Sequence, residues 1–256
     1  MFNFFKSSKP KENTDLKWLA ADMHSHLIPG IDDGSPDVDT SLTLIHGLQE
    51  LGFTHFFATP HIYSEIYPND RQSITAAQNQ LNQALKMDQR FDQLGQQGVQ
   101  AAAEYMLDDH TVQLFDAAAS ADHTLMTLPG KQVLVEMSYQ FERKDMLDQL
   151  FKLQLGGYKP ILAHPERYVF YHKDYKNYKR IKERGAKFQI NLLSLSGYYG
   201  EGVRKVAQTM VTEGIIDYIG TDLHHDKHLA ALQTFVRNHD MRKLFQNCTI
   251  LNQQLL

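Results

Sequence analysis

From Leu19 onward, short β-rich runs alternate regularly with longer amphipathic runs, and this alternation is the strongest constraint on the fold. Seven runs have the composition of strands, namely "WLAADM" (18–23), "THFFAT" (54–59), "VQAAAE" (99–104), "QVLVEM" (132–137), "KPILAH" (159–164), "KFQINL" (187–192) and "IDYIGT" (216–221). A chain that alternates strands with helices is typical of βα units around a parallel sheet. The pattern therefore predicts an α/β fold.

The segments between these runs carry apolar residues at helical spacing. In "DVDTSLTLIHGLQELG" (37–52), Val38, Leu42, Ile45 and Leu48 recur on one face, and Gly52 follows as a signal for the end of a helix. On length alone, 256 residues could form one large α/β barrel or two small domains. Because no linker rich in Pro, Gly or Ser divides the chain, one barrel-like domain is the simplest interpretation.

This interpretation divides the chain into a short polar lead, residues 1–17, and a single domain, residues 18–256. The lead contains Phe2, Phe4 and Phe5 among polar residues. A flexible tail is favoured there over a docking peptide made from these three rings.

Composition and charge exclude several functional classes. The net charge of -4 and the absence of a long basic block argue against nucleic acid as a partner. No run of 18 apolar residues is present, so membrane insertion is not expected. Cys248 is the single cysteine, which excludes a disulfide framework and a thiolate metal site and favours the cytoplasm.

Each predicted strand ends in, or is followed by, a polar residue. In a βα barrel the chemistry lies where strands end and loops begin. The residues at these positions are His24, His26, His61, Glu104, Glu136, His164, Asn191, Asp222 and His224. Five histidines and three carboxylates are in this set, and the turn Asp32-Asp33-Gly34 can add one more carboxylate. That gives about nine nitrogen and oxygen ligands, more than one ion takes. The count predicts a cluster of two or three metal ions with bridging carboxylates.

Each residue also has a simpler explanation. A lone histidine at a strand end is more often structural, and "DDG" alone is more often only a turn. Glu104 and Glu136 are harder to explain in this way, because they follow the apolar runs "AAA" and "VLV". An unpaired carboxylate in such surroundings costs several kcal/mol, and a bound metal ion removes that cost.

Four motifs together resemble a known family. The stretches "DMHSHLIPGIDDGS", "ATPHIYSEIYPN", "ILAHPERY" and "GTDLH" are similar to those of the PHP (polymerase and histidinol phosphatase) superfamily. They resemble more closely its bacterial protein-tyrosine phosphatases, which act on the tyrosine kinases of capsule and exopolysaccharide synthesis. The resemblance covers residues 18–250 and implies a distorted (β/α)7 TIM-like barrel, the PHP fold.

The resemblance also implies a cofactor, a substrate and a ligand set. It implies three divalent metal ions (Mn, Fe or Zn) and, as substrate, a phosphotyrosine-bearing bacterial tyrosine kinase. Carried over position by position, the metal ligands are His24, His26, Asp33, His61, Glu104, Glu136, His164, Asp222 and His224.

The reaction that follows is attack of a metal-bridging hydroxide on phosphorus, without a covalent phosphoenzyme. By resemblance, Arg167 binds the phosphate. The candidates for aiding proton transfer are Asp222, His224 and a water of the cluster. Some relatives have a second arginine beyond the Asp-x-His motif. This chain reads "HHDKH" there, so Lys227 is the nearest cation.

The substrate and the reaction class leave alternatives open. Five aromatic residues follow strand-end motifs and are candidates for a phenyl slot or for loop packing, namely Tyr63, Tyr67, Phe141, Phe170 and Tyr171. The second candidate substrate is a small phosphomonoester such as histidinol phosphate. A non-catalytic kinase partner and a nuclease are disfavoured by the complete ligand set and by the charge balance. A cysteine-based phosphatase is excluded, because no arginine follows Cys248.

Overall fold

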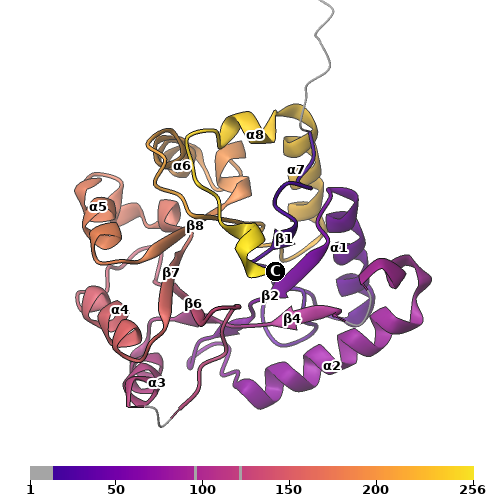
Figure 1. The fold of residues 1–256 in the computed structure, drawn as a ribbon, viewed down its shortest axis with the longest axis horizontal. Coiled ribbons are helices and arrows are strands. Elements are labelled where there is room, and N and C mark those ends of the chain that lie inside the picture. Colours follow the sequence, from indigo (N-terminus) through magenta and orange to yellow (C-terminus); the bar gives the residue numbers. More distant parts are fainter. Residues whose placement is uncertain (1–13, 95–96, 121–122) are drawn as a thin grey trace, which may run out of the picture.

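The computed structural model describes residues 14–94, 97–120 and 123–256, in which parallel strands occupy the middle of the molecule and helices surround them (Figure 1). Nine strands lie in these residues: β1 (Ala21–Asp22), β2 (His55–Ala58), β3 (His61–Ile62), β4 (Val99–Ala101), β5 (Glu104–Met106), β6 (Gln132–Glu136), β7 (Lys159–Ala163), β8 (Lys187–Asn191) and β9 (Tyr218–Gly220). They form a sheet of order β1-β2-β4 and a second of order β3-β5-β6-β7-β8-β9. Every strand pairing in both sheets is parallel.

All seven predicted runs contain a strand. At two of them the strand is interrupted and a second short strand follows. Thr59-Pro60 separates β2 from β3, and Ala102-Ala103 separates β4 from β5. Proline has no amide hydrogen to donate to a ladder, which accounts for an interruption at residue 60. The α/β class and the parallel strands are confirmed. In the part of the chain that the structure describes, the ladders form two sheets and not one closed barrel.

Backbone hydrogen bonds nevertheless link the two sheets at both ends. Across the break, Ala102 N donates to Ala58 O at 2.9 Å and Glu104 N donates to Pro60 O at 3.1 Å. Beyond β1 and β9, Asp222 N donates to His24 O at 2.8 Å. The carboxyl ends of the first and last strands therefore lie side by side.

The helices lie outside the sheets and follow the strands in sequence (Figure 1). They are α1 (Val38–Glu50), α2 (Arg71–Met87), α3 (Asp109–Ala119), α4 (Met146–Leu155), α5 (Lys176–Glu183), α6 (Glu201–Thr212), α7 (Asp226–Asn238) and α8 (Met241–Leu244). Short 3-10 helices span Gln89–Leu94, Pro165–Arg167, Val169–Tyr171, Leu192–Ser196 and Asn252–Leu255.

Helix α1 has the boundaries that its sequence predicts. The side chain of Asp37 accepts a hydrogen bond from Thr40 N at 2.8 Å, which caps the helix start. The predicted apolar face, including Leu42, Ile45 and Leu48, is buried. Gly52 follows the helix with φ +105°, a conformation that glycine adopts without strain.

The C-terminal segment covers the amino ends of the strands. Asn252 Nδ2 donates to Ala21 O at 3.0 Å and to Ile219 O at 2.7 Å, and its Oδ1 accepts from Ile219 N at 3.0 Å. The C-terminus accordingly lies near β1 and β2 in the centre of the view in Figure 1. The carboxyl ends of the strands lie on the other side of the sheets, away from this cover.

The predicted N-terminal lead lies mostly outside the described residues, and so do Phe2, Phe4 and Phe5. Leu16, which the prediction placed in the lead, is fully buried, and its amide donates to Leu51 O at 2.7 Å. The buried core therefore extends into the predicted lead as far as Leu16. Among the described helices, none has the length and apolar character needed to cross a membrane.

Candidate metal centre

The structure brings the nine predicted ligands together at the carboxyl ends of the strands. Eight of them fall into three overlapping groups, and within each group the ligand atoms lie within 4.8 Å of one another. The groups are His26, Asp33, His61 and His224; His24, His26, Glu104 and Asp222; and His61, Glu104 and Glu136. The groups share His26, His61 and Glu104. The ninth residue, His164, adjoins them through its Nε2, which is 2.9 Å from Glu104 Oε1.

Several ligand atoms in this cluster are buried without a hydrogen-bond partner. They are Nε2 of His24 and His26, Nδ1 of His61, and one carboxylate oxygen each of Glu104 and Glu136. These atoms approach one another or Asp222 at 2.8 to 3.4 Å without hydrogen-bonding geometry. Buried polar atoms are normally satisfied, so such a set fits bound cations.

The electrostatics of the cluster also fit bound cations. Burial by itself would raise the pKa of Glu104, but His24 and His61 hold that pKa well below its usual range. Burial would lower the pKa of His26, but Asp32 and the carboxylates of Asp222 and Glu104 raise it well above its usual range. A buried centre that stabilises positive charge this strongly matches divalent cations as well as protons.

Two ligand candidates are held in an unusual backbone conformation. His164 has φ 33° and Asp222 has φ 51°, in the left-handed region that residues other than glycine seldom adopt. Each follows the end of a strand, β7 or β9. Strain of this kind persists where the surrounding structure imposes it, and it clusters at functional sites.

Two side chains outside the predicted ligand set orient the histidines. Asp32 Oδ2 is 2.8 Å from His26 Nδ1, and the same carboxylate accepts from Gly34 N at 3.0 Å. Gln189 Oε1 is 2.8 Å from His24 Nδ1. These contacts direct the Nε2 atoms of both histidines into the cluster, as partners of metal-binding histidines do. No local pattern in the sequence singles out Gln189, and "DDG" does not distinguish the role of Asp32 from that of Asp33.

A cavity of about 250 Å³ opens beside this cluster. It is lined by Asp33, His61, Tyr139, Arg167, Tyr199, Asp222, His224, His225 and His228. Arg167 Nη1 donates to Asp222 Oδ2 at 3.1 Å. The cavity thus combines cluster residues with an arginine whose side chain is 19% exposed, an arrangement that suits an anionic ligand.

Other predicted substrate residues do not line this cavity. Lys227 is exposed at the start of α7, where His225 and His228 take the lining positions. Tyr67 stacks on His61 with 5.5 Å between ring centroids, and Tyr63 pairs with Tyr67 through the backbone. The structure places both tyrosines beside a ligand candidate but outside the cavity lining.

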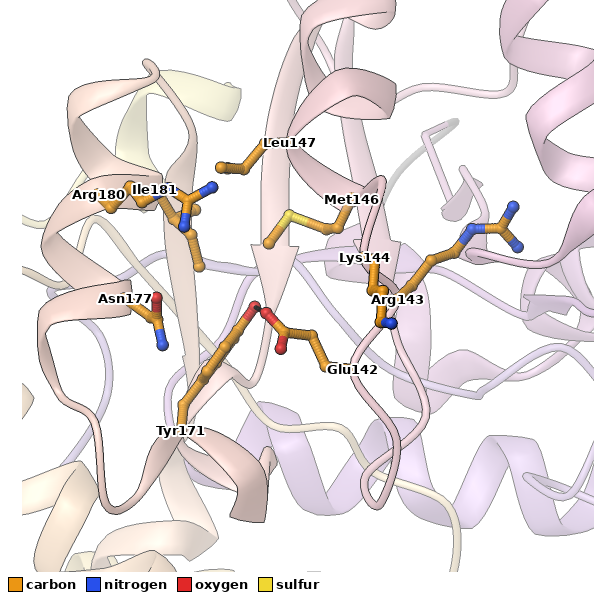
Figure 2. A pocket seen from close by; sticks show the side chains of 9 residues that line it. All are labelled: Glu142, Arg143, Lys144, Met146, Leu147, Tyr171, Asn177, Arg180 and Ile181. Atoms are coloured by element: carbon orange, nitrogen blue, oxygen red, sulfur yellow. Dashed lines mark hydrogen bonds between the residues drawn. The ribbon is translucent and has the colours of Figure 1, made fainter.

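The remaining aromatic candidates pack elsewhere. Phe141 is 73% exposed, and Phe170 packs against the core. Tyr171 belongs to a separate small hollow between the loop before α4 and helix α5, where its hydroxyl points to Glu142 and donates to Oε1 at 2.8 Å (Figure 2). Loop packing therefore accounts for Phe170 and Tyr171. Tyr139 and Tyr199, which do line the cavity, were missed because nothing in their local sequence distinguishes them.

Comparison with known proteins agrees with this geometry. A family model described as capsular polysaccharide synthesis, CpsB/CapC, matches residues 20–244. The tyrosine-protein phosphatase YwqE of Bacillus subtilis is 28% identical over 208 residues, which cover 80% of this chain and 78% of that protein. The putative tyrosine-protein phosphatase CapC of Staphylococcus aureus is 24% identical over 208 residues, which cover 79% and 76%.

A solved structure is also similar. It comes from work on YwqE of Bacillus subtilis and CpsB of Streptococcus pneumoniae, which its description calls metal-dependent tyrosine phosphatases. The match has a TM-score of 0.71 and 25% sequence identity, and it covers 90% of this chain and 96% of that chain.

Proposed function

Because the chain belongs to the CpsB/CapC family of capsular polysaccharide synthesis, we propose that it is a metal-dependent protein-tyrosine phosphatase. The observation that carries this proposal is the buried cluster of His24, His26, Glu104 and their neighbours directly beside a cavity that holds Arg167. Bound divalent ions there would activate water and neutralise charge on the phosphate.

Three overlapping donor groups support a centre of three ions. Glu104, which belongs to two of these groups, would help to hold the ions, because its carboxylate has two oxygens to offer. The donors are imidazole nitrogens and carboxylate oxygens, a set that suits Mn, Fe or Zn. His164 would complete the set from its place beside Glu104.

The protein residues of the cavity have separate tasks. Arg167 binds the non-bridging oxygens of the phosphate, since its guanidinium offers several donors in one plane. Asp222 holds Nη1 of Arg167 and so fixes the orientation of that group. Asp222 and His224 both line the cavity and are the candidates for aiding proton transfer during hydrolysis.

The substrate that we propose is phosphotyrosine on a bacterial tyrosine kinase of capsule or exopolysaccharide synthesis. The family description and the phosphatase names of the relatives support this assignment. Cytoplasm is the compartment we propose, in keeping with the unpaired thiol of Cys248.

We further propose that the two sheets together form the distorted (β/α)7 barrel of the PHP fold in a single domain. If β2 with β3 and β4 with β5 count as interrupted strands, the nine strands correspond to seven positions. The bridge between Ser25 and Leu223 supports closure between the first and last of them.

Hydrolysis assays on the metal-loaded protein test the function. A phosphotyrosyl peptide, histidinol phosphate and an oligonucleotide should be compared under identical conditions. We expect release of phosphate from the phosphotyrosyl peptide at the highest kcat/KM. Preference for histidinol phosphate would favour a small-molecule phosphatase, and cleavage of the oligonucleotide would favour a nuclease.

A further inference from the structure

The guanidinium of Arg167 lies between two tyrosine rings. Its Cζ is 4.0 Å from the ring centroid of Tyr139 and 4.3 Å from that of Tyr199. Both distances are well inside the range of about 6 Å for an attractive contact between a cation and a ring face. Tyr139 and Tyr199 also line the cavity beside the cluster.

The three residues come from different loops. Tyr139 follows β6, Arg167 ends the 3-10 helix after β7, and Tyr199 precedes α6. The carbonyl of Tyr139 accepts a hydrogen bond from Val169 N at 3.3 Å, which ties the first loop to the second. The rings are therefore positioned by the fold and are not neighbours of Arg167 in sequence.

The loop that carries Tyr199 makes a tight turn between two glycines. Gly197 has φ +87° and Gly200 has φ +100°, and Gly200 N donates to Gly197 O at 2.9 Å. This tight turn presents Tyr199 to the arginine. The hydroxyl of Tyr199 is buried and has no hydrogen-bond partner, so its ring, rather than a polar bond, accounts for its position here.

The hydrogen bonding of Arg167 leaves donors on its guanidinium for a ligand. Among the described residues, the side chain donates through Nη1 to Asp222, and no bond is made by Nε or Nη2. Two rings thus hold the plane of the guanidinium, one carboxylate holds one of its nitrogens, and donors are left over for a ligand. A free arginine side chain would lose conformational entropy on binding, and a side chain held in advance loses less.

We propose that Tyr139 and Tyr199 are positioning residues that clamp Arg167 between their rings and so prepare it to bind the phosphate group of the substrate. The inference rests on the proposed function for the identity of the substrate. The clamp itself is a statement about phosphate binding, and it is tested separately from hydrolysis.

Binding of inorganic phosphate to the metal-loaded protein, measured by calorimetry, is the first test. We expect Tyr139→Leu and Tyr199→Leu each to weaken phosphate binding about tenfold. Tyr139→Phe and Tyr199→Phe retain the rings and should keep the affinity within about twofold of wild type. Phe151→Leu removes an exposed ring on α4 and is the matched control. Equal losses for the Phe and Leu variants would overturn the clamp, because the hydroxyl and not the ring would then matter.

A double-mutant cycle is the second test, and it separates a positioning role from a structural one. Each Leu substitution is combined with Arg167→Met, and metal content and Tm are recorded for every variant. If the tyrosines act through Arg167, the Leu substitutions should change phosphate affinity less than about twofold when the arginine is absent. The same tenfold loss in both backgrounds would show that the rings act independently of Arg167.

The two proposals fail in different ways. If phosphate binding depends on both rings but the protein does not hydrolyse phosphotyrosine, the clamp is supported and the proposed function is refuted. Protein that hydrolyses phosphotyrosine with unchanged phosphate affinity in both Leu variants would refute the clamp alone.

Discussion

Asp222 accepts a hydrogen bond from Arg167 through one carboxylate oxygen while its other oxygen faces the metal-ligand cluster. Oδ2 is 3.1 Å from Arg167 Nη1, and Oδ1 is 3.3 Å from Nε2 of His24. The arginine does not pair with Glu166, whose buried carboxylate instead accepts from Asn191 N at 3.0 Å and from Ser194 Oγ at 2.6 Å. One carboxylate therefore connects the cluster to the residue that we assign to phosphate binding.

Arg167→Lys should lower kcat/KM for a phosphotyrosyl peptide by about tenfold to a thousandfold, equivalent to roughly 1.4 to 4 kcal/mol of transition-state stabilisation. Lysine keeps the charge but loses the planar fork that matches two phosphate oxygens. Steady-state kinetics with metal analysis on the same samples measures this. Near-normal turnover, or a loss of activity that follows loss of metal, would mean that Arg167 does not bind the phosphate.

Removal of metal by a strong chelator should abolish hydrolysis, and readdition of a divalent ion should restore it, because activation of water at neutral pH requires the ions. Reducing agents should have little effect. Cys248 is half-buried, and burial raises the pKa of its thiol, so it is a poor nucleophile at neutral pH. The mechanism would be refuted by full turnover in protein shown to be free of metal.

Glu136→Ala and His164→Ala should each lower metal content as well as activity. Both side chains are buried in the cluster, 2% and 1% exposed, so each truncation removes a ligand atom that solvent does not replace in the same position. His110→Ala, on the exposed face of α3, is the control and should change neither quantity. Full metal occupancy in both cluster variants would remove these two residues from the ligand set.

Phosphotyrosyl peptides should be hydrolysed with a higher kcat/KM than phosphoseryl peptides. The cavity places the rings of Tyr139 and Tyr199 beside the cluster, where they can contact the phenyl group of phosphotyrosine. The shorter aliphatic ester of phosphoserine offers no ring for these contacts. Equal efficiency on matched peptides that differ only in the phosphorylated residue would contradict this account of specificity.

Gly34→Ala should destabilise the protein by about 1 to 3 kcal/mol, the usual cost of an overpacked site. A Cβ at Gly34 would lie 2.3 Å from both Cβ and O of His26, so the loop after β1 must shift. Thermal or denaturant unfolding measures this, and metal affinity should fall with it. Gly202→Ala is the control, because a Cβ there would meet only the His172 side chain, at an ordinary 3.6 Å, and alanine favours the helix α6. Equal stability of the two variants would show that Gly34 is not sterically constrained.

Much of the fold was predictable because its signals are local. Each β-rich run and each amphipathic segment carries its own periodicity, and the cap of α1 at Asp37 is a contact between residues three positions apart. The break at the end of the run 54–59 and the break within the run 99–104 were not predictable in the same way, apart from the hint that Pro60 gives. Pairing between strands is decided by the partner strand, which the local sequence does not contain.

The amino-acid sequence alone was enough to identify the strand ends that carry candidate metal-ligand side chains, because the end of a strand and the identity of the next residue are both local properties. His24, Glu104 and His164 could be assigned to one rim in this way, since parallel strands end at the same edge. The surroundings of Arg167, in contrast, are visible only in the folded molecule. The contacts with Tyr139, Tyr199 and Asp222 join residues 28 to 55 positions from Arg167 in sequence. Such contacts depend on where loops cross in space, and the hydrogen bonds and packing that fix those crossings form only when the whole chain has folded.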